Sequence, residues 1–371
     1  MRRIRIVHTA DLHLDSPFEG LSAAQASIRR GEQRALLGAI ADVCASESAD
    51  LLLMSGDLLD SWNTFYETGE ELARCLGSVS CPVFISPGNH DFYSPRSPWA
   101  RLKLPDHVTV FRENAVRFTA VPEAGARVYG AAFTDSRCGP LLKGFHAERK
   151  NGIYNILCMH AEVGNPNSAY NPVSTEELAD SGLDYAAFGH VHSASGLRQA
   201  GGTHYSWPGC PEGRGFDECG EKTVSVVELE GGECELRTVS VAQRRYQKLA
   251  VDISDGDPLL LIHTALPDDT VRDVYRITLT GETEIPPDLR RLHQNLDEMF
   301  FSLQLRDETG VRQSVWERAG EDSLRGIFLA RLRERWDEAA DDAQRARIEQ
   351  AARWGLAALD NAEEVRVHEA P

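Results

Sequence analysis

Residues able to bind a metal ion recur along the first half of the sequence, each time at the end of a short apolar run. Asp11 and His13 follow the run RIRIV, and Asp57 follows LLLMS. The arrangement returns in PGNHDF with Asn89, His90 and Asp91, in CMHAE with His160, and in FGHVHS with His190 and His192. In layered α/β folds the carboxyl ends of strands meet at one edge, so these side chains are expected to converge there.

Two of the motifs place metal-binding side chains two residues apart. In an extended chain, residues i and i+2 point to the same face. The pair Asp11 and His13 and the pair His190 and His192 are therefore each expected to reach one common centre. The residue between the two members of each pair would point into the core.

The donors are too numerous for a single ion that keeps positions open for water. Seven side chains form the predicted ligand set: Asp11, His13, Asp57, Asn89, His160, His190 and His192. Two ions that share a carboxylate would account for them, as in sites that hold two metals roughly 3.5–4 Å apart for a displacement reaction. The set contains no cysteine, which argues against a structural zinc site. Mixed carboxylate, imidazole and amide donors favour Mn²⁺, with Fe and Zn²⁺ as alternatives.

Each motif alone also has a structural explanation. A Gly-Asp pair such as Gly56-Asp57 is a common turn, and a lone histidine such as His160 often sits satisfied at a strand end. The five motifs together make this explanation improbable.

The elements that must position these residues alternate between strands and helices. Apolar runs around residues 4–8, 51–55 and 83–86 predict strands, and the periodicity of residues 22–47 and 65–76 predicts helices. This alternation indicates a layered α/β domain. The pattern changes near residue 245, so we predict a catalytic domain over residues 1–243 and a smaller α+β region over 244–371 that ends in two amphipathic helices.

Composition limits the function classes. The 371 residues carry a net charge of −18, which argues against a broad basic surface for nucleic acid. No apolar run approaches the roughly 20 residues of a membrane span, and a cytoplasmic location without membrane contact is expected. Eight cysteines without a C-x-x-C pair favour reduced thiols.

In order and spelling, the five motifs resemble those of the calcineurin-like metallophosphoesterases: D-x-H, G-D, G-N-H-D/E, H and G-H-x-H. The resemblance covers residues 11–192 and implies a four-layer αββα sandwich with a dinuclear site at one sheet edge. It implies one ion on Asp11, His13, Asp57 and His192, and a second on Asp57, Asn89, His160 and His190. It also implies catalytic roles for His90, a histidine that binds no metal, and for Asp91, which would orient His90 or hold the turn.

The sequence further resembles the SbcD-like nucleases, and among them the YhaO-type DNA repair exonuclease proteins. The stretches that carry this resemblance are HTADLHLDSPF, WPGCPEGRGFDECGEK and SLRGIFLARL. It implies manganese-dependent cleavage of DNA beside an SMC-like coiled-coil ATPase of the SbcC or YhaN type, with residues 244–371 as a cap and docking segment. Such nucleases are usually dimeric. Arg214 is a candidate phosphate contact because a guanidinium matches phosphate oxygens; the alternative is a solvated loop arginine.

Two other functions stay open. The same metal site could serve a phosphodiesterase or phosphatase that acts on a small molecule, a nucleotide or a phosphoprotein, and the acidic balance mildly favours it, since DNA affinity depends on neutralised phosphates. The chain could instead be a scaffold subunit with little catalysis. The complete ligand set and His90 argue against the scaffold.

Overall fold

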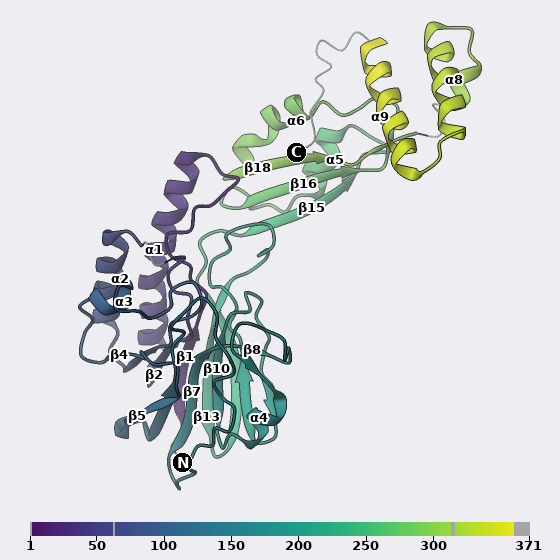
Figure 1. Ribbon diagram of the computed structural model, residues 1–371. Helices are drawn as coiled ribbons and strands as arrows, with labels where there is room; N and C mark the ends of the chain where they lie inside the picture. Colours follow the sequence, from purple (N-terminus) through teal and green to yellow (C-terminus); the bar gives the residue numbers. More distant parts are fainter. Residues whose placement is uncertain (1, 62–63, 313–315, 360–371) are drawn as a thin grey trace. The chain divides into compact units, whose positions relative to one another are not determined.

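The computed structural model describes residues 2–61, 64–312 and 316–359, and the chain forms two compact units, residues 1–245 and 246–371 (Figure 1). The functions assigned to the two regions in the sequence analysis stay predictions. All eight cysteines are unpaired, and each lies in the described ranges. Within those ranges, no helix is long and apolar enough to cross a membrane.

Two six-stranded mixed sheets form the centre of the first unit. The first sheet has the order β14-β13-β1-β2-β3-β4, with β1 Ile4–Thr9, β2 Leu51–Met54, β3 Val83–Ile85, β4 Val108–Val110, β13 Thr223–Glu230 and β14 Glu233–Ser240. The second has the order β11-β12-β10-β7-β6-β5, with β5 Arg117–Val121, β6 Ala126–Gly130, β7 Tyr154–His160, β10 Tyr185–Gly189, β11 Arg198–Ala200 and β12 Thr203–Ser206. A short pair, β8 Glu162–Val163 and β9 Pro172–Val173, lies beyond β7.

Helices cover the outer faces of the two sheets. The helices α1 Ala23–Ser46 and α2 Tyr66–Ser78, with the short α3 Pro98–Arg101, cover the first sheet, and α4 Thr175–Asp180 covers the second (Figure 1). Ser174 and Glu177 form a capping box at the start of α4. A third apolar cluster, including Ile6 and Ile156, fills the space between the sheets. The layers are therefore helix, sheet, sheet and helix, the predicted αββα sandwich.

The candidate ligands follow the carboxyl ends of parallel strands. Strands β1, β2 and β3 are parallel in the first sheet, and β7 and β10 are parallel in the second. His160 ends β7 and is paired in register with Gly189, the last residue of β10. Both sheets thus deliver donors to the same edge of the sandwich.

Gly189 marks a close approach of the two sheets at this edge. A Cβ at this position would lie 2.0 Å from the carbonyl oxygen of Ser55 and 2.9 Å from Nδ1 of His160. We expect Gly189→Ala to lower the free energy of unfolding by about 1–3 kcal/mol, because the sheets must separate to admit the methyl group. Urea unfolding followed by circular dichroism measures this.

Gly38→Ala is the matched control. Gly38 lies inside α1, and a Cβ there would have nothing within 4 Å. This variant should gain up to about 1 kcal/mol, because alanine is the better helix former. A Gly189→Ala protein as stable as the wild type would contradict the close approach.

The second unit has a small parallel sheet of its own. Its order is β15-β16-β18, with β15 Tyr246–Asp252, β16 Val274–Thr280 and β18 Ser302–Asp307, and the connections contain α5 Pro258–Ala265 and α6 Leu289–Leu296. A short pair joins β17 Glu282–Thr283 to β19 Gly310–Val311. The two helices α8 Leu324–Asp337 and α9 Asp342–Leu359 follow and pack on one another around Leu329 and Leu356.

Candidate metal centre

The structure brings the predicted ligands together. Oxygen and nitrogen atoms lying within 4.8 Å of one another form three overlapping groups: Asp11 with His13 and His192, Asp11 with Asp57 and His160, and His13 with Asp57 and His90. The first two consist of predicted ligands alone and are called the first and second donor groups. Asn89 joins the second group, because its Oδ1 lies 3.0 Å from Nε2 of His160. Residues from both sheets and five separate loops or strand ends are therefore assembled at one edge.

The backbone of this edge adopts an unusual conformation. Asp11, His13, Asp57 and His190 have φ values of 54°, 45°, 50° and 98°, in the region that non-glycine residues rarely adopt. The expectation that Asp11 and His13, and likewise His190 and His192, share one face of an extended strand is wrong, because β1 ends at Thr9 and β10 ends at Gly189. Each such residue costs on the order of 1–3 kcal/mol and persists only when its surroundings hold it.

Hydrogen bonds between neighbouring loops hold these conformations. The amide of Asp11 donates to the carbonyl of Gly56 at 2.9 Å, and the amide of His13 donates to the carbonyl of Asp57 at 2.9 Å. The carboxylate of Asp11 accepts from the amide of His190 at 3.1 Å, which links the first sheet to the second. The ligand loops therefore position one another.

The Nε2 atoms of two histidines, His13 and His192, face each other. Nε2 of His13 lies 3.3 Å from Nε2 of His192. Nδ1 of His13 lies 3.2 Å from the carboxylate of Asp60, and Nδ1 of His192 lies 2.7 Å from the carboxylate of Glu218. The guanidinium of Arg214 also lies 3.1 Å from Nδ1 of His192, and a ring whose proton is on Nδ1 directs its Nε2 lone pair at the other ring. A cation between them would satisfy both, as in metal sites where a carboxylate fixes the histidine tautomer.

His160 repeats this pattern at the neighbouring position. Its Nδ1 donates to the carbonyl oxygen of Ser55 at 2.9 Å, so in the neutral ring Nε2 is the acceptor. That Nε2 faces Oδ1 of Asn89 at 3.0 Å and Oδ2 of Asp57 at 3.4 Å. His190 lies beside it, with the two ring centroids 5.2 Å apart. The donor set thus forms two adjacent groups, with Asp57 near both.

The electrostatics of the protein groups favour bound cations. Asp11 and Asp57 are buried, and burial raises the pKa of Asp11. Burial acts the same way on Asp57, but the neighbouring histidines, His160 first, outweigh it and hold the pKa of Asp57 below its ordinary value. Burial would lower the pKa of His160, yet Asp57 and Asp11 raise it to about 9. The ring therefore compensates the two buried carboxylates, which is a task that divalent ions can take over.

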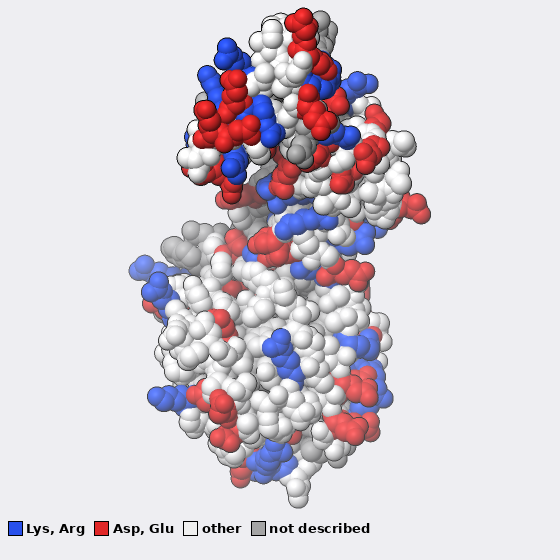
Figure 2. Space-filling model, turned by 90° about the vertical axis from the view of Figure 1, so that its right-hand side faces the viewer, with Lys and Arg blue, Asp and Glu red and all other residues white. Residues whose placement is uncertain are grey.

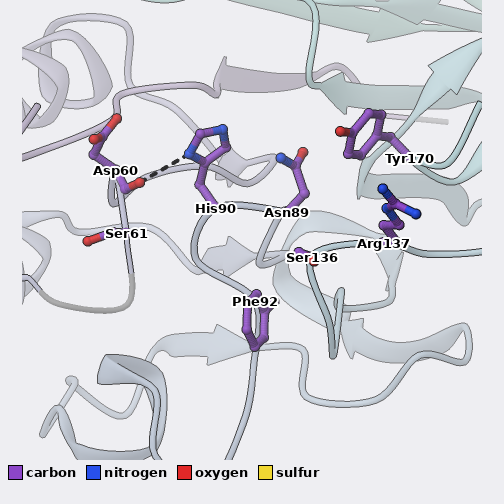
Figure 3. Close-up of a pocket in the computed structure, with 8 residues that line it drawn as sticks. All are labelled: Asp60, Ser61, Asn89, His90, Phe92, Ser136, Arg137 and Tyr170. Atoms are coloured by element: carbon purple, nitrogen blue, oxygen red, sulfur yellow. Dashed lines mark hydrogen bonds between the residues drawn. The ribbon is translucent and has the colours of Figure 1, made fainter.

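His90 is held at the side of this cluster. Its Nδ1 donates to the backbone carbonyl of Asp60 at 3.0 Å, and its amide donates to the carboxylate of Asp57 at 2.9 Å. Its ring centroid lies 4.7 Å from that of His13. His90 also lines a cavity of about 490 Å³ beside Asn89 (Figure 3).

Asp91 fastens the turn that carries Asn89 and His90. The buried carboxylate accepts from the amides of Gly88 at 2.8 Å and Leu58 at 2.9 Å. Burial and the nearby Asp57 raise the pKa of Asp91 to about 7. Of the two roles expected for Asp91, the geometry favours holding the turn, since the imidazole of His90 bonds to Asp60 instead.

Sequence reasoning missed two carboxylates, Asp60 and Glu218, that contact the candidate ligands. Asp60 lies in the stretch SGDLLD, three residues after Asp57, and Glu218 lies in the loop GRGFDE. The signal available in the sequence was that Glu218 lies inside WPGCPEGRGFDECGEK, which carried the resemblance, and that Asp60 lies close to the predicted ligand Asp57. Arg214 lies between them: it contacts Glu218 at 2.6 Å and Asp60 at 3.4 Å, so two carboxylates share its guanidinium.

A sandwich of two mixed sheets with this donor set at one edge is the architecture of a metallophosphoesterase. The family model described as calcineurin-like phosphoesterase matches residues 4–194, just over half of the chain, and the protein belongs to this family. Membership and the donor geometry together indicate a dinuclear divalent-metal site and a phosphoesterase hydrolase.

Curated relatives are similar at low identity. The metallophosphoesterase YhaO of Bacillus subtilis is 24% identical over 276 residues, which cover 71% of this chain and 67% of the relative. The SbcD polypeptide of the nuclease SbcCD from the same organism is 24% identical over 273 residues, which cover 62% of this chain and 67% of the relative.

Solved structures align with part of the chain at low identity. TT1561 of Thermus thermophilus aligns with a TM-score of 0.41 and 13% identity, over 64% of this chain and 99% of that one. A dimetal phosphatase from Danio rerio aligns with a TM-score of 0.42 and 11% identity, over 64% of this chain and 96% of that one.

Proposed function

We propose that the protein is a dinuclear, manganese-dependent phosphodiester hydrolase that cleaves DNA as the nuclease subunit of a repair complex. The observation that carries the metal chemistry is the pair of Nε2 atoms of His13 and His192, 3.3 Å apart, with both Nδ1 atoms facing carboxylates. The similarity to the SbcD polypeptide of the SbcCD nuclease supports DNA as the substrate and an SbcC-like coiled-coil ATPase as the partner.

The proposed ligand assignment follows the two donor groups. Asp11, His13, Asp57 and His192 would hold one ion, and Asp57, Asn89, His160 and His190 the other, with Asp57 shared. When bound, two such ions acidify water and neutralise the charge that develops on a phosphoryl group. The loops that hold Asp11 and Asp57 in place supply the rigid geometry on which this depends.

His90 is the proposed source of a proton or of a hydrogen bond. Hydrolysis forms a P–O bond from water and breaks the P–O bond to the leaving group, whose oxygen must gain a proton. Nδ1 of His90 is committed to the carbonyl of Asp60, so Nε2 is the atom left to serve the substrate. Such proton transfer contributes typically about 10²–10⁴-fold to the rate.

The acidic composition favours a second candidate, a phosphodiesterase for a small molecule or nucleotide. On the face shown in Figure 2, the lysine and arginine side chains of residues 1–245 are interspersed with aspartate and glutamate. A DNA-binding surface gains affinity from each phosphate it neutralises, and such a mixed surface gives little.

A substrate panel tests both candidates. The purified full chain with Mn²⁺ is offered linear DNA, nicked DNA and bis-p-nitrophenyl phosphate, with and without the coiled-coil ATPase. Cleavage of DNA supports the nuclease. Hydrolysis of the small diester alone, unchanged by the ATPase, supports the second candidate and rejects the nuclease.

Glu218 is expected to be a positioning residue for His192. Glu218→Ala removes the carboxylate that lies 2.7 Å from Nδ1 and should weaken binding of Mn²⁺ about 10–100-fold, because such partners fix the tautomer and direction of a ligand histidine. Isothermal titration with Mn²⁺ measures the loss. Glu218→Gln should recover part of the affinity, since its amide oxygen still accepts from Nδ1.

Glu221→Ala is the control for this change. Glu221 is exposed in the same loop and its removal costs the same charge. Equal losses in Glu218→Ala and Glu221→Ala would show that net charge, rather than the contact with His192, sets the affinity.

A further inference from the structure

A cavity opens directly beside the candidate metal centre. It measures about 490 Å³, within the usual range for small-molecule sites. Eight residues line it: Asp60, Ser61, Asn89, His90, Phe92, Ser136, Arg137 and Tyr170. Figure 3 shows Asn89 and His90 in the middle, with Arg137 and Tyr170 together on one side and Asp60 and Ser61 on the other.

Arg137 is the only arginine or lysine among the lining residues. It is exposed, and it makes no ion pair with any residue in the described part of the chain. Arg214 and Arg29, by contrast, are each bound by carboxylates. Arg137 lies beside the phosphoesterase centre and is therefore suited to bind an anion. A guanidinium binds phosphate oxygens through paired hydrogen bonds.

The wall that carries Arg137 and Tyr170 is fixed to the metal centre. The amide of Cys138 donates to the carbonyl of Ala169 at 2.9 Å, and the amide of Asn171 donates to the carbonyl of Cys138 at 2.8 Å. The buried side chain of Asn171 also donates to the carbonyl of His160 at 2.9 Å. Both loops are thus tied to the end of β7, and the backbone next to Arg137 is held in place relative to the centre.

Two aromatic rings line the same cavity. The ring of Tyr170 lies 4.9 Å from that of His190 with a tilt of 35°, so it borders the centre directly. Phe92 follows the turn of Asn89 and His90 and is half-buried, and the next residue is held by its amide, which donates to Phe133 at 2.8 Å. Aromatic faces stack on nucleobases of any sequence.

We propose that this cavity binds the nucleotide next to the scissile phosphate, with its base against Phe92 and Tyr170 and its flanking phosphate at Arg137. The inference rests on the proposed phosphodiester hydrolysis and narrows its substrate to a strand whose base is unpaired at the cleavage point. The ligand chemistry, a nucleobase with a flanking phosphate, occurs in single-stranded DNA and in short nucleotides.

Three substrates separate the parts of this ligand. Bis-p-nitrophenyl phosphate offers a diester alone, the p-nitrophenyl ester of thymidine 5′-monophosphate adds a nucleoside, and a single-stranded oligonucleotide adds flanking phosphates. In Phe92→Leu and Tyr170→Leu, kcat/KM for the thymidine ester relative to bis-p-nitrophenyl phosphate should fall about tenfold, as expected for a lost base stack. In Arg137→Ala, kcat/KM for the oligonucleotide relative to the thymidine ester should fall about tenfold, and Arg137→Lys should restore part of it.

Arg149→Ala is the matched control. Arg149 is an exposed arginine of the same unit near Asp184, at the opposite ends of β7 and β10 from the centre. Arg149→Ala should leave both kcat/KM ratios at their wild-type values. Equal changes in Arg137→Ala and Arg149→Ala, or equal losses on all three substrates, would overturn the subsite while leaving diester hydrolysis in place.

Failure of the proposed function gives a different result. A wild-type protein that cleaves no diester fails as a phosphodiesterase. Fluorescence anisotropy of a labelled oligonucleotide then tests the subsite by itself: weaker binding to Arg137→Ala than to Arg149→Ala supports it, and equal binding rejects it. If only short nucleotides, and no oligonucleotide, show the aromatic and arginine effects, the cavity serves a small nucleotide.

Discussion

Asp57→Asn is expected to abolish phosphodiester hydrolysis and to reduce the bound metal at both positions. Asp57 is buried, its Oδ2 lies 3.4 Å from Nε2 of His160 and 3.9 Å from Nε2 of His13, and it therefore borders both donor groups. Loss of the shared carboxylate removes several kcal/mol of charge stabilisation, which corresponds to about 10³-fold or more in kcat/KM. Hydrolysis of bis-p-nitrophenyl phosphate and metal content by plasma mass spectrometry are the measurements.

Asp180→Asn provides the control for this variant. Asp180 is an exposed carboxylate at the end of α4, and its replacement changes the net charge by the same amount. It should retain activity and metal. An Asp57→Asn protein that keeps two ions at wild-type affinity would remove Asp57 from the shared position.

His90→Ala is expected to lose turnover while both ions stay bound. Its Nδ1 is bonded to a backbone carbonyl, and Nε2 remains for the substrate, so the loss should be about 10²–10⁴-fold in kcat with little change in metal affinity. Steady-state kinetics with bis-p-nitrophenyl phosphate and titration with Mn²⁺ distinguish the two effects.

The structure also allows a different result for His90→Ala, in which His90 is itself a metal ligand. His13, Asp57 and His90 offer ligand atoms within 4.8 Å of one another, so His90 could itself be a ligand. Loss of metal together with activity in His90→Ala would establish that role. His107→Ala is a matched control, since His107 binds the carbonyl of Leu76 at 3.1 Å and lies outside the two donor groups.

The order of the motifs was enough to predict most of the fold and the convergence of the metal-binding side chains at one edge. The apolar runs before Asp57, Asn89 and His160 do form strands, β2 and β3 in the first sheet and β7 in the second, because period and hydrophobicity are local properties that determine which face is buried. The backbone conformation of Asp11 and His13 could not be predicted in this way. Their positive φ values depend on hydrogen bonds to the loop at Gly56 and Asp57, which tertiary structure alone provides.

The polar partners of the donors were missed for the same reason. Glu218 reaches His192 from 26 residues along the chain, and no spacing rule connects a loop glutamate to a particular imidazole. The bridge between Cys138 and Tyr170, which brings Arg137 to the cavity, joins two irregular loops and has no periodic signature.

The contacts across the centre have a consequence for how the sandwich holds together. Ser55 follows a strand of the first sheet, yet its hydroxyl donates to Ala187 in the second at 2.9 Å and its carbonyl accepts from His160 at 2.9 Å. Because the proposed ligands also come from both sheets, binding of the ions stabilises the contact between the two sheets. The stability of the protein then depends on the concentration of free metal: each tenfold rise above the dissociation constant adds about 1.4 kcal/mol per ion to the free energy of unfolding.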